Sequence, residues 1–138
     1  MNVREIYVDV IPRGEKGKHK LKDILVDTGA TFTVLPADIL RKVDALHYKV
    51  EPRRKLKLGD GGEVETDLYI ATLALADREA PTFIVTFNGA QPVVGVRALE
   101  DLGLKVDPVK GKLEPTRPKG VAYSYHLELK MLGHALIW

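Results

Sequence analysis

Short runs of apolar and polar residues, several of them alternating, recur along this chain and predict a mainly β protein. The runs are separated by turns that contain glycine or proline, which is the usual punctuation between strands. We expect strands over residues 3–11, 21–26, 31–35, 55–58, 64–74, 82–87, 104–106 and 112–114. So many short strands in one small chain indicate a mainly β domain with little helix.

Two short helices are expected between these strands. Pro36 suits the first turn of a helix, and the apolar residues that follow it share one helical face. A second helix is expected over residues 97–102, and Gly103 is placed to end it. Residues 44–52 are expected to form a polar connection without regular structure.

The end of the chain has a different pattern. Residues 115–120 contain two prolines and are expected to be a linker. Residues 121–131 then alternate strictly between apolar and polar, which is typical of a strand with one buried face. We therefore divide the chain into a domain over residues 1–114 and a C-terminal extension over residues 115–138.

The composition of the chain excludes several classes of protein. The chain has 138 residues, enough for one domain with one core, and its 21 basic and 19 acidic residues leave a formal charge of +2. The absence of cysteine excludes disulfides and thiolate metal sites, and the four histidines lack ligand spacing, so no metal or other cofactor is expected. No apolar run approaches the roughly 20 residues that span a bilayer. We expect a cytoplasmic protein that binds neither membrane nor nucleic acid.

The candidate chemistry lies in the string Asp27-Thr28-Gly29-Ala30. An apolar strand leads into it and a β-branched segment follows it. An acid on a glycine-containing turn between two strands can be partly desolvated and used in a reaction, whereas most surface carboxylates are simply solvated. Asp27 is therefore the first candidate for a catalytic residue.

Three features in this order resemble the retroviral-type (retropepsin-like) aspartic proteases. They are the Asp27-Thr28-Gly29-Ala30 string, a glycine-rich hairpin around residues 59–62, and the segment Val93-Val94-Gly95 before a short helix. The resemblance covers roughly residues 3–106. It implies a single-lobe acid protease barrel that hydrolyses peptide bonds of polypeptide substrates.

Such an endopeptidase needs a water molecule between two carboxylates that share one proton. The chain contains only one Asp-Thr-Gly string and is too short for two lobes. The resemblance therefore implies a homodimer in which the two copies of Asp27 meet at the symmetry axis.

The resemblance also assigns roles to the neighbouring residues. Thr28, Gly29 and Ala30 would form the active-site loop and a dimer contact. The hairpin would be a flap that closes over an extended substrate. Two residues of the segment before the second helix would form the floor of the cleft. The flap residues are Gly59, Asp60, Gly61 and Gly62, and the floor residues are Val94 and Gly95.

The chain departs from the family in two places. Many members carry an Asp after Asp-Thr-Gly-Ala and an Arg after the apolar-apolar-Gly segment, and the two can pair. Here these positions are Thr31 and Val96, so both partners are absent together, and Arg97 comes one position late. The second departure is the extension over residues 115–138, whose strand is expected to lie at the dimer interface.

Two other classes of function stay open. In the first, Asp27 only caps a turn, and the chain is a catalytically silent dimerisation or peptide-binding module with the same fold. In the second, the chain is a small RNA-binding β domain. The only support for RNA binding is two basic clusters, near residues 16–20 and 53–57, and such clusters are more often solvated hairpin ends.

Overall fold

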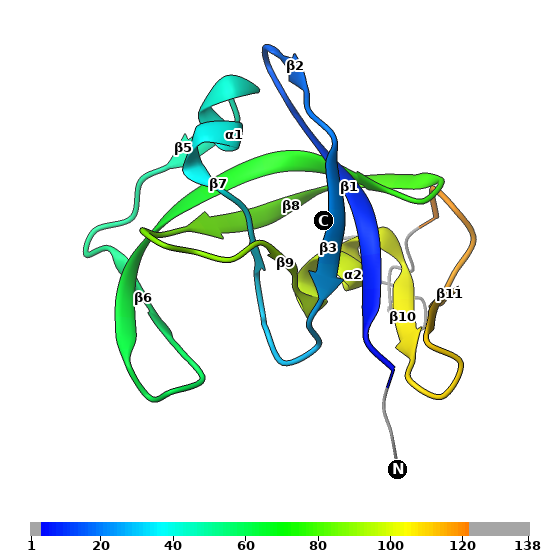
Figure 1. The fold of residues 1–138 in the computed structure, drawn as a ribbon. Coiled ribbons are helices and arrows are strands. Elements are labelled where there is room, and N and C mark those ends of the chain that lie inside the picture. Colours follow the sequence, from blue (N-terminus) through cyan, green and yellow to red (C-terminus); the bar gives the residue numbers. More distant parts are fainter. Residues whose placement is uncertain (1–3, 122–138) are drawn as a thin grey trace, which may run out of the picture.

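The computed structural model of the chain describes residues 4–121 and contains a closed six-stranded barrel of mixed strand directions (Figure 1). Neighbouring strands follow the order β1, β3, β9, β4, β8, β7, and β7 pairs back onto β1. The β3–β9 and β4–β8 pairs are parallel, and the others are antiparallel. The barrel strands are β1 (Ile6–Gly14), β3 (Leu21–Val26), β4 (Thr33–Val34), β7 (Glu63–Leu75), β8 (Arg78–Thr86) and β9 (Val93–Val94). The expectation of a mainly β, barrel-like domain is confirmed.

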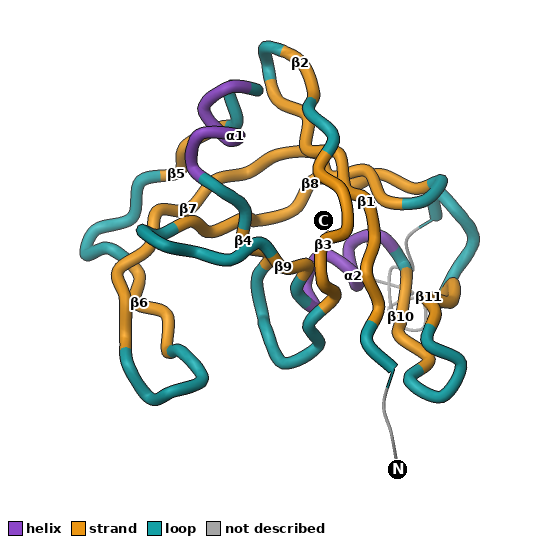
Figure 2. The backbone as a smooth tube through the Cα atoms, in the orientation of Figure 1, coloured by secondary structure: helices purple, strands orange, loops and turns teal. Residues whose placement is uncertain are grey.

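The remaining elements decorate this barrel (Figure 2). The two short helices predicted from the sequence are present, and β10 and β11 form a separate hairpin. These elements are β2 (Gly17–Lys18), α1 (Ala37–Lys42), β5 (Leu46–Tyr48), β6 (Arg54–Lys57), α2 (Val96–Leu102), β10 (Leu104–Asp107) and β11 (Lys112–Pro115).

Strand β7 organises this arrangement because it is long enough to pair with three strands along one edge. It pairs first with β6, then with β5 and finally with β1, while its other edge pairs with β8 from Asp67 to Leu75. The β6–β7 hairpin therefore extends beyond the barrel, as Figure 1 shows at the lower left.

The barrel interior is filled by aliphatic side chains from all of its longer strands. Each fully buried side chain of this kind contributes roughly 1.5–3 kcal/mol to folding. Helix α2 covers part of the barrel with one buried face and ends at Gly103, whose φ of 74° is the left-handed cap expected from the sequence. The most deeply buried core residues include Val10, Leu35, Leu40, Leu73, Ile84, Val94 and Leu99.

Several predicted boundaries are wrong, among them the start of the strand expected over residues 82–87, which begins at Arg78. The first strand runs on to Gly14, through part of the expected turn. The strand expected over residues 31–35 is only Thr33–Val34, because the carbonyl of Thr31 accepts a hydrogen bond from the N-terminus of α2 instead of from a strand. The expected polar connection over residues 44–52 contains β5, which the pattern does not reveal because all three of its residues are exposed. Of the predicted strand over residues 121–131, only Val121 lies within the described residues, and it is not in a strand.

Candidate functional site

Asp27 follows the last residue of β3, where that strand pairs with β9. The register places Val26 opposite Val94 in a parallel pair, and the Asp27 amide donates a 2.9 Å hydrogen bond to the carbonyl of Val94. Parallel pairing of two interior strands fixes the backbone of Asp27 from one side. Its side chain is half-buried.

The loop after Asp27 folds back onto the carboxylate. The amide of Gly29 donates a 2.9 Å hydrogen bond to Asp27 Oδ1, and the amide of Ala30 donates a 3.0 Å bond to the Asp27 carbonyl. Within residues 4–121, no protein group donates to Asp27 Oδ2 and no cation forms an ion pair with Asp27. One carboxylate oxygen is thus fixed in place, and the other has no partner among the described residues.

The structure brings Val94 and Gly95 against this loop. Val94 is fully buried, and a Cβ atom added to Gly95 would lie 2.5 Å from the carbonyl carbon and oxygen of Phe32. Beyond Gly95, the amide of Val96 donates a 2.8 Å hydrogen bond to the Ala30 carbonyl. The site loop and the start of α2 are therefore in direct backbone contact, which leaves little freedom in the position of Asp27.

Thr31 and Val96 bring no charge to this contact. They are the two positions where the sequence departs from the pattern of the family that it resembles. Thr31 is exposed and Val96 is half-buried. The Arg97 amide donates to the Thr31 carbonyl at 3.0 Å, while its side chain is exposed. Among the described residues, Arg97 makes no ion pair, so no charged pair ties the loop to α2.

Residues Gly59–Gly62 form the exposed tip of the β6–β7 hairpin. Two hydrogen bonds close the tip, from Leu58 to the Gly62 carbonyl at 2.7 Å and from Gly61 to the Leu58 carbonyl at 3.0 Å. The Gly62 amide also donates to Asp60 Oδ1 at 2.8 Å. In Figure 1 this tip and the loop after β3 project from the same side of the barrel. Within the described part of the chain, no hydrogen bond joins them.

A second apolar cluster, which the sequence reasoning missed, lies outside the barrel core. Its buried centre is Val34, Leu68 and Val85. Around them lie partly buried apolar residues from the hairpin, the site loop and the segment before α2. These residues are Phe32, Val50, Leu56, Phe83, Phe87, Ala90 and Val93. A signal for it exists in β8, where Phe83 and Val85 alternate with the core residue Ile84, so that both faces of the strand are apolar.

Asp27 also lines a groove. Its walls include Arg4, Ile6, Thr28 and Pro108, so the N-terminal segment and the β10–β11 turn both border the candidate carboxylate. The amide of Arg4 donates to the Pro108 carbonyl at 3.4 Å. The turn itself is stabilised by Asp107. The amides of Lys110 and Val109 donate to its carboxylate, which helps to lower the pKa of Asp107 below its usual value.

Residues 4–121 hold no group of three or more histidine, aspartate or glutamate side chains that is arranged to bind a metal ion. No helix in the same residues is long and apolar enough to cross a membrane. No protein-family model and no curated protein sequence matches the chain.

Proposed function

We propose that this chain is one subunit of a homodimeric, retropepsin-like aspartic endopeptidase and that its barrel is the single lobe of such an enzyme. The observation that carries the proposal is the position and hydrogen bonding of Asp27. It follows a barrel strand, Gly29 fixes one of its oxygens, and the other oxygen has no partner among the described residues. A carboxylate in this state can take a proton from water once a second, protonated carboxylate is beside it.

The second carboxylate would come from another copy of the chain. In a two-fold dimer each Asp27 lies beside its symmetry mate when the contact surface includes the site loop. Two carboxylates at this distance cannot both ionise, so they share one proton. One then activates the water molecule, and the other donates to the carbonyl oxygen of the scissile bond.

The apolar cluster and the β6–β7 hairpin support a polypeptide as the substrate. An extended peptide presents side chains alternately to two sides, and partly buried residues such as Phe32, Leu56 and Val93 would receive its apolar side chains. The glycine-rich tip would close over the peptide and donate backbone hydrogen bonds. This arrangement favours cleavage between apolar residues.

The test is hydrolysis of an unfolded protein substrate from acidic to neutral pH by the wild-type chain and by Asp27→Asn. The asparagine keeps an oxygen that accepts from the Gly29 amide, so the loop is preserved while the titratable group is lost. Asp23→Asn, which alters an exposed carboxylate on the same strand, is the matched control. We expect cleavage by the wild type and Asp23→Asn only, and equal cleavage by Asp27→Asn would eliminate the mechanism.

Mixing the two proteins tests the shared site. After subunit exchange, an equal mixture of wild type and Asp27→Asn leaves each wild-type subunit with a wild-type partner about half of the time. Activity per wild-type subunit should therefore fall to about half, whereas independent sites would leave it unchanged. If neither protein cleaves while both dimerise and bind peptide, the chain is the catalytically silent module instead.

A further inference from the structure

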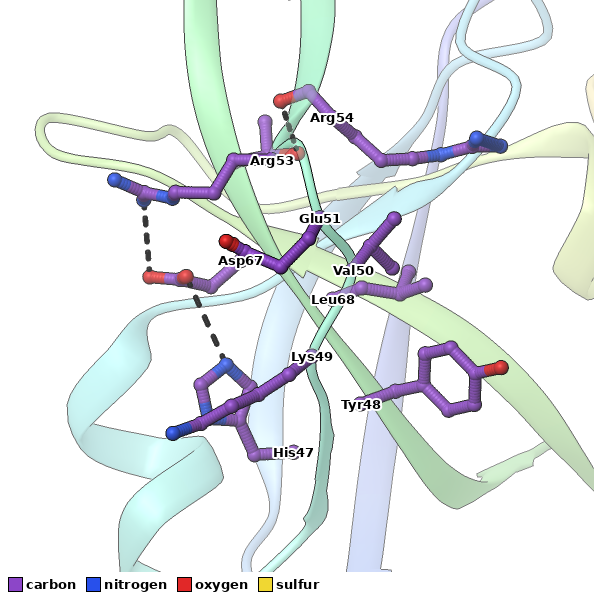
Figure 3. Close-up of a pocket in the computed structure, with 10 residues that line it drawn as sticks. His47, Tyr48, Lys49, Val50, Glu51, Arg53, Arg54, Asp67 and Leu68 are labelled. Atoms are coloured by element: carbon purple, nitrogen blue, oxygen red, sulfur yellow. Dashed lines mark hydrogen bonds and ion pairs between the residues drawn. The ribbon is translucent and has the colours of Figure 1, made fainter.

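A small pocket lies at the root of the β6–β7 hairpin, away from Asp27. It is formed by β5, by the connection from β5 to β6, and by the part of β7 opposite them. Figure 3 shows its side chains in two groups that point in different directions. The two groups differ in whether their charged side chains are paired within the protein.

The first group consists of charged side chains that are paired with one another. Arg53 lies 3.3 Å from one carboxylate oxygen of Asp67, and His47 Nε2 lies 3.7 Å from the other. Arg53 also reaches Glu65 at 3.6 Å, and the ring of His47 stacks on Tyr69 with a centroid distance of 4.7 Å. These contacts bind β5 and the connecting segment to β7. Two carboxylates, Glu65 and Asp67, share the Arg53 guanidinium here, so that guanidinium is not free to attract an acidic ligand.

The second group combines an apolar floor with an unpaired cation. The side chains of Tyr48, Val50 and Leu68 point to the same side as that of Arg54 in Figure 3. Within residues 4–121, no carboxylate forms an ion pair with the Arg54 guanidinium. The nearby hydroxyl of Thr66 donates to the Arg54 carbonyl, so it leaves the guanidinium free.

This second group is continuous with the apolar cluster beside the Asp27 loop. Val50 and Leu68 belong to the apolar cluster that also contains Phe32 and Val93 beside the Asp27 loop. Arg54 precedes Leu56 by two positions on β6, so both side chains lie on the same face of that strand, and Leu56 is part of the cluster. A peptide that follows the cluster away from Asp27 would therefore reach Arg54.

We infer that this pocket is a distal specificity subsite that accepts an acidic side chain, preferably glutamate, of the polypeptide substrate; the inference rests on the proposed endopeptidase function. The apolar stem of glutamate would pack on Val50 and Leu68. Its carboxylate would accept two parallel hydrogen bonds from the Arg54 guanidinium, a geometry that lysine cannot supply. The subsite would thus select substrates by a residue remote from the scissile bond.

The experiment compares peptides that share one cleavable apolar core and carry Glu or Gln at successive positions on either side of it. At one position the Glu peptide should be cleaved with a kcat/KM about fivefold higher, as expected for a partly exposed ion pair, and the difference should lie in KM. Arg54→Gln should bring the Glu-to-Gln ratio to about one. Lys55→Gln is the matched control, since it removes one positive charge from the opposite face of the same strand.

Binding to the Asp27→Asn protein separates this inference from the proposed function. Fluorescence anisotropy of the labelled Glu and Gln peptides measures the subsite whether or not the wild-type chain cleaves. A Glu preference that Arg54→Gln abolishes and Lys55→Gln retains supports the subsite, even if no peptide is cleaved. Equal affinity for both peptides, absence of binding to either, or equal losses in the two variants would overturn it.

Discussion

The backbone amide of Gly95 donates a buried 3.0 Å hydrogen bond to the hydroxyl of Thr33, 62 positions earlier in the chain. Thr33 belongs to β4, and Gly95 immediately precedes α2. This bond, together with the bond from Val96 to the Ala30 carbonyl, fixes both ends of the short segment that follows Asp27. The rigidity of the candidate site therefore depends on a neutral side chain that takes no part in the proposed chemistry.

Replacement of this hydroxyl should destabilise the whole barrel. Thr33→Val keeps the shape of the side chain but leaves the buried Gly95 amide without an acceptor, at a cost of about 1–3 kcal/mol in the free energy of unfolding. Thr33→Ser keeps the acceptor and should lose less. Urea denaturation of the three proteins measures the difference. A Thr33→Val protein as stable as wild type would show that the hydrogen bond between Gly95 and Thr33 does not contribute to the free energy of unfolding.

Gly95 should not tolerate any side chain. A Cβ atom there would lie 2.5 Å from main-chain atoms of Phe32 and 2.9 Å from the carbonyl of Ala30, and neither main-chain segment can move without shifting the Asp27 loop. We expect Gly95→Ala to lower the free energy of unfolding by about 3 kcal/mol, the upper part of the usual range for overpacking, and to abolish any cleavage.

Gly59→Ala provides the comparison for this variant. A Cβ atom at Gly59 would have no neighbour within 4 Å. Thermal unfolding should therefore show a clearly lower Tm for Gly95→Ala and almost no change for Gly59→Ala. Equal melting temperatures would contradict the close contact between Gly95 and the site loop.

Features fixed by neighbouring residues could be predicted from the sequence, whereas contacts between distant segments could not. The hairpin tip at Gly59–Gly62 and the cap at Gly103 follow from local backbone preferences, and the structure has both. The parallel pairing of β3 with β9 and the Arg53–Asp67 contact depend on the register of segments far apart in the chain. No local pattern specifies that register.

The second apolar cluster also could not be predicted from the local sequence pattern. Phe32 and Leu56 lie in a bend and in a short exposed strand, and neither position has the periodicity of a core element. Only the fold brings them onto the face of β8 that points away from the barrel core. The sequence thus predicted the candidate carboxylate but not the apolar surface near it.

Arg78 should contribute far more to stability than an ordinary surface arginine. Its guanidinium donates to the carbonyls of Leu102, Gly103 and Arg117 at 2.8–3.1 Å, so it joins the end of α2 to the segment after β11. Arg78→Met keeps the aliphatic stem but removes these bonds, and we expect a loss of about 2–3 kcal/mol.

Arg13→Met is the matched control for this prediction. Arg13 forms a single ion pair with Glu79 at 2.8 Å, and both side chains are about half exposed. Such pairs contribute about 1 kcal/mol or less. Denaturant titration should therefore separate the two variants clearly, and a similar small loss in both would show that the Arg78 contacts add nothing to folding.

The β10–β11 turn should make stability depend on pH at the acidic end. The amide of Lys110 is the main cause of the lowered pKa of Asp107, and the amide of Val109 adds to it. Because the folded-state pKa is below the unfolded one, ionised Asp107 stabilises the folded chain at every pH above the unfolded value. That contribution is lost as the pH falls through the lowered folded-state pKa.

Asp107→Asn should therefore be less stable than wild type at neutral pH, and the difference should shrink steadily as the pH falls below about 4, the ordinary range of an aspartate. The asparagine oxygen still accepts from the backbone amides, so the variant removes the charge and keeps the turn. Thermal unfolding across this range measures the effect, with Asp44→Asn, an exposed aspartate in another turn, as the control. A difference that stays constant with pH would mean that the Asp107 charge does not stabilise the turn beside the groove at Asp27.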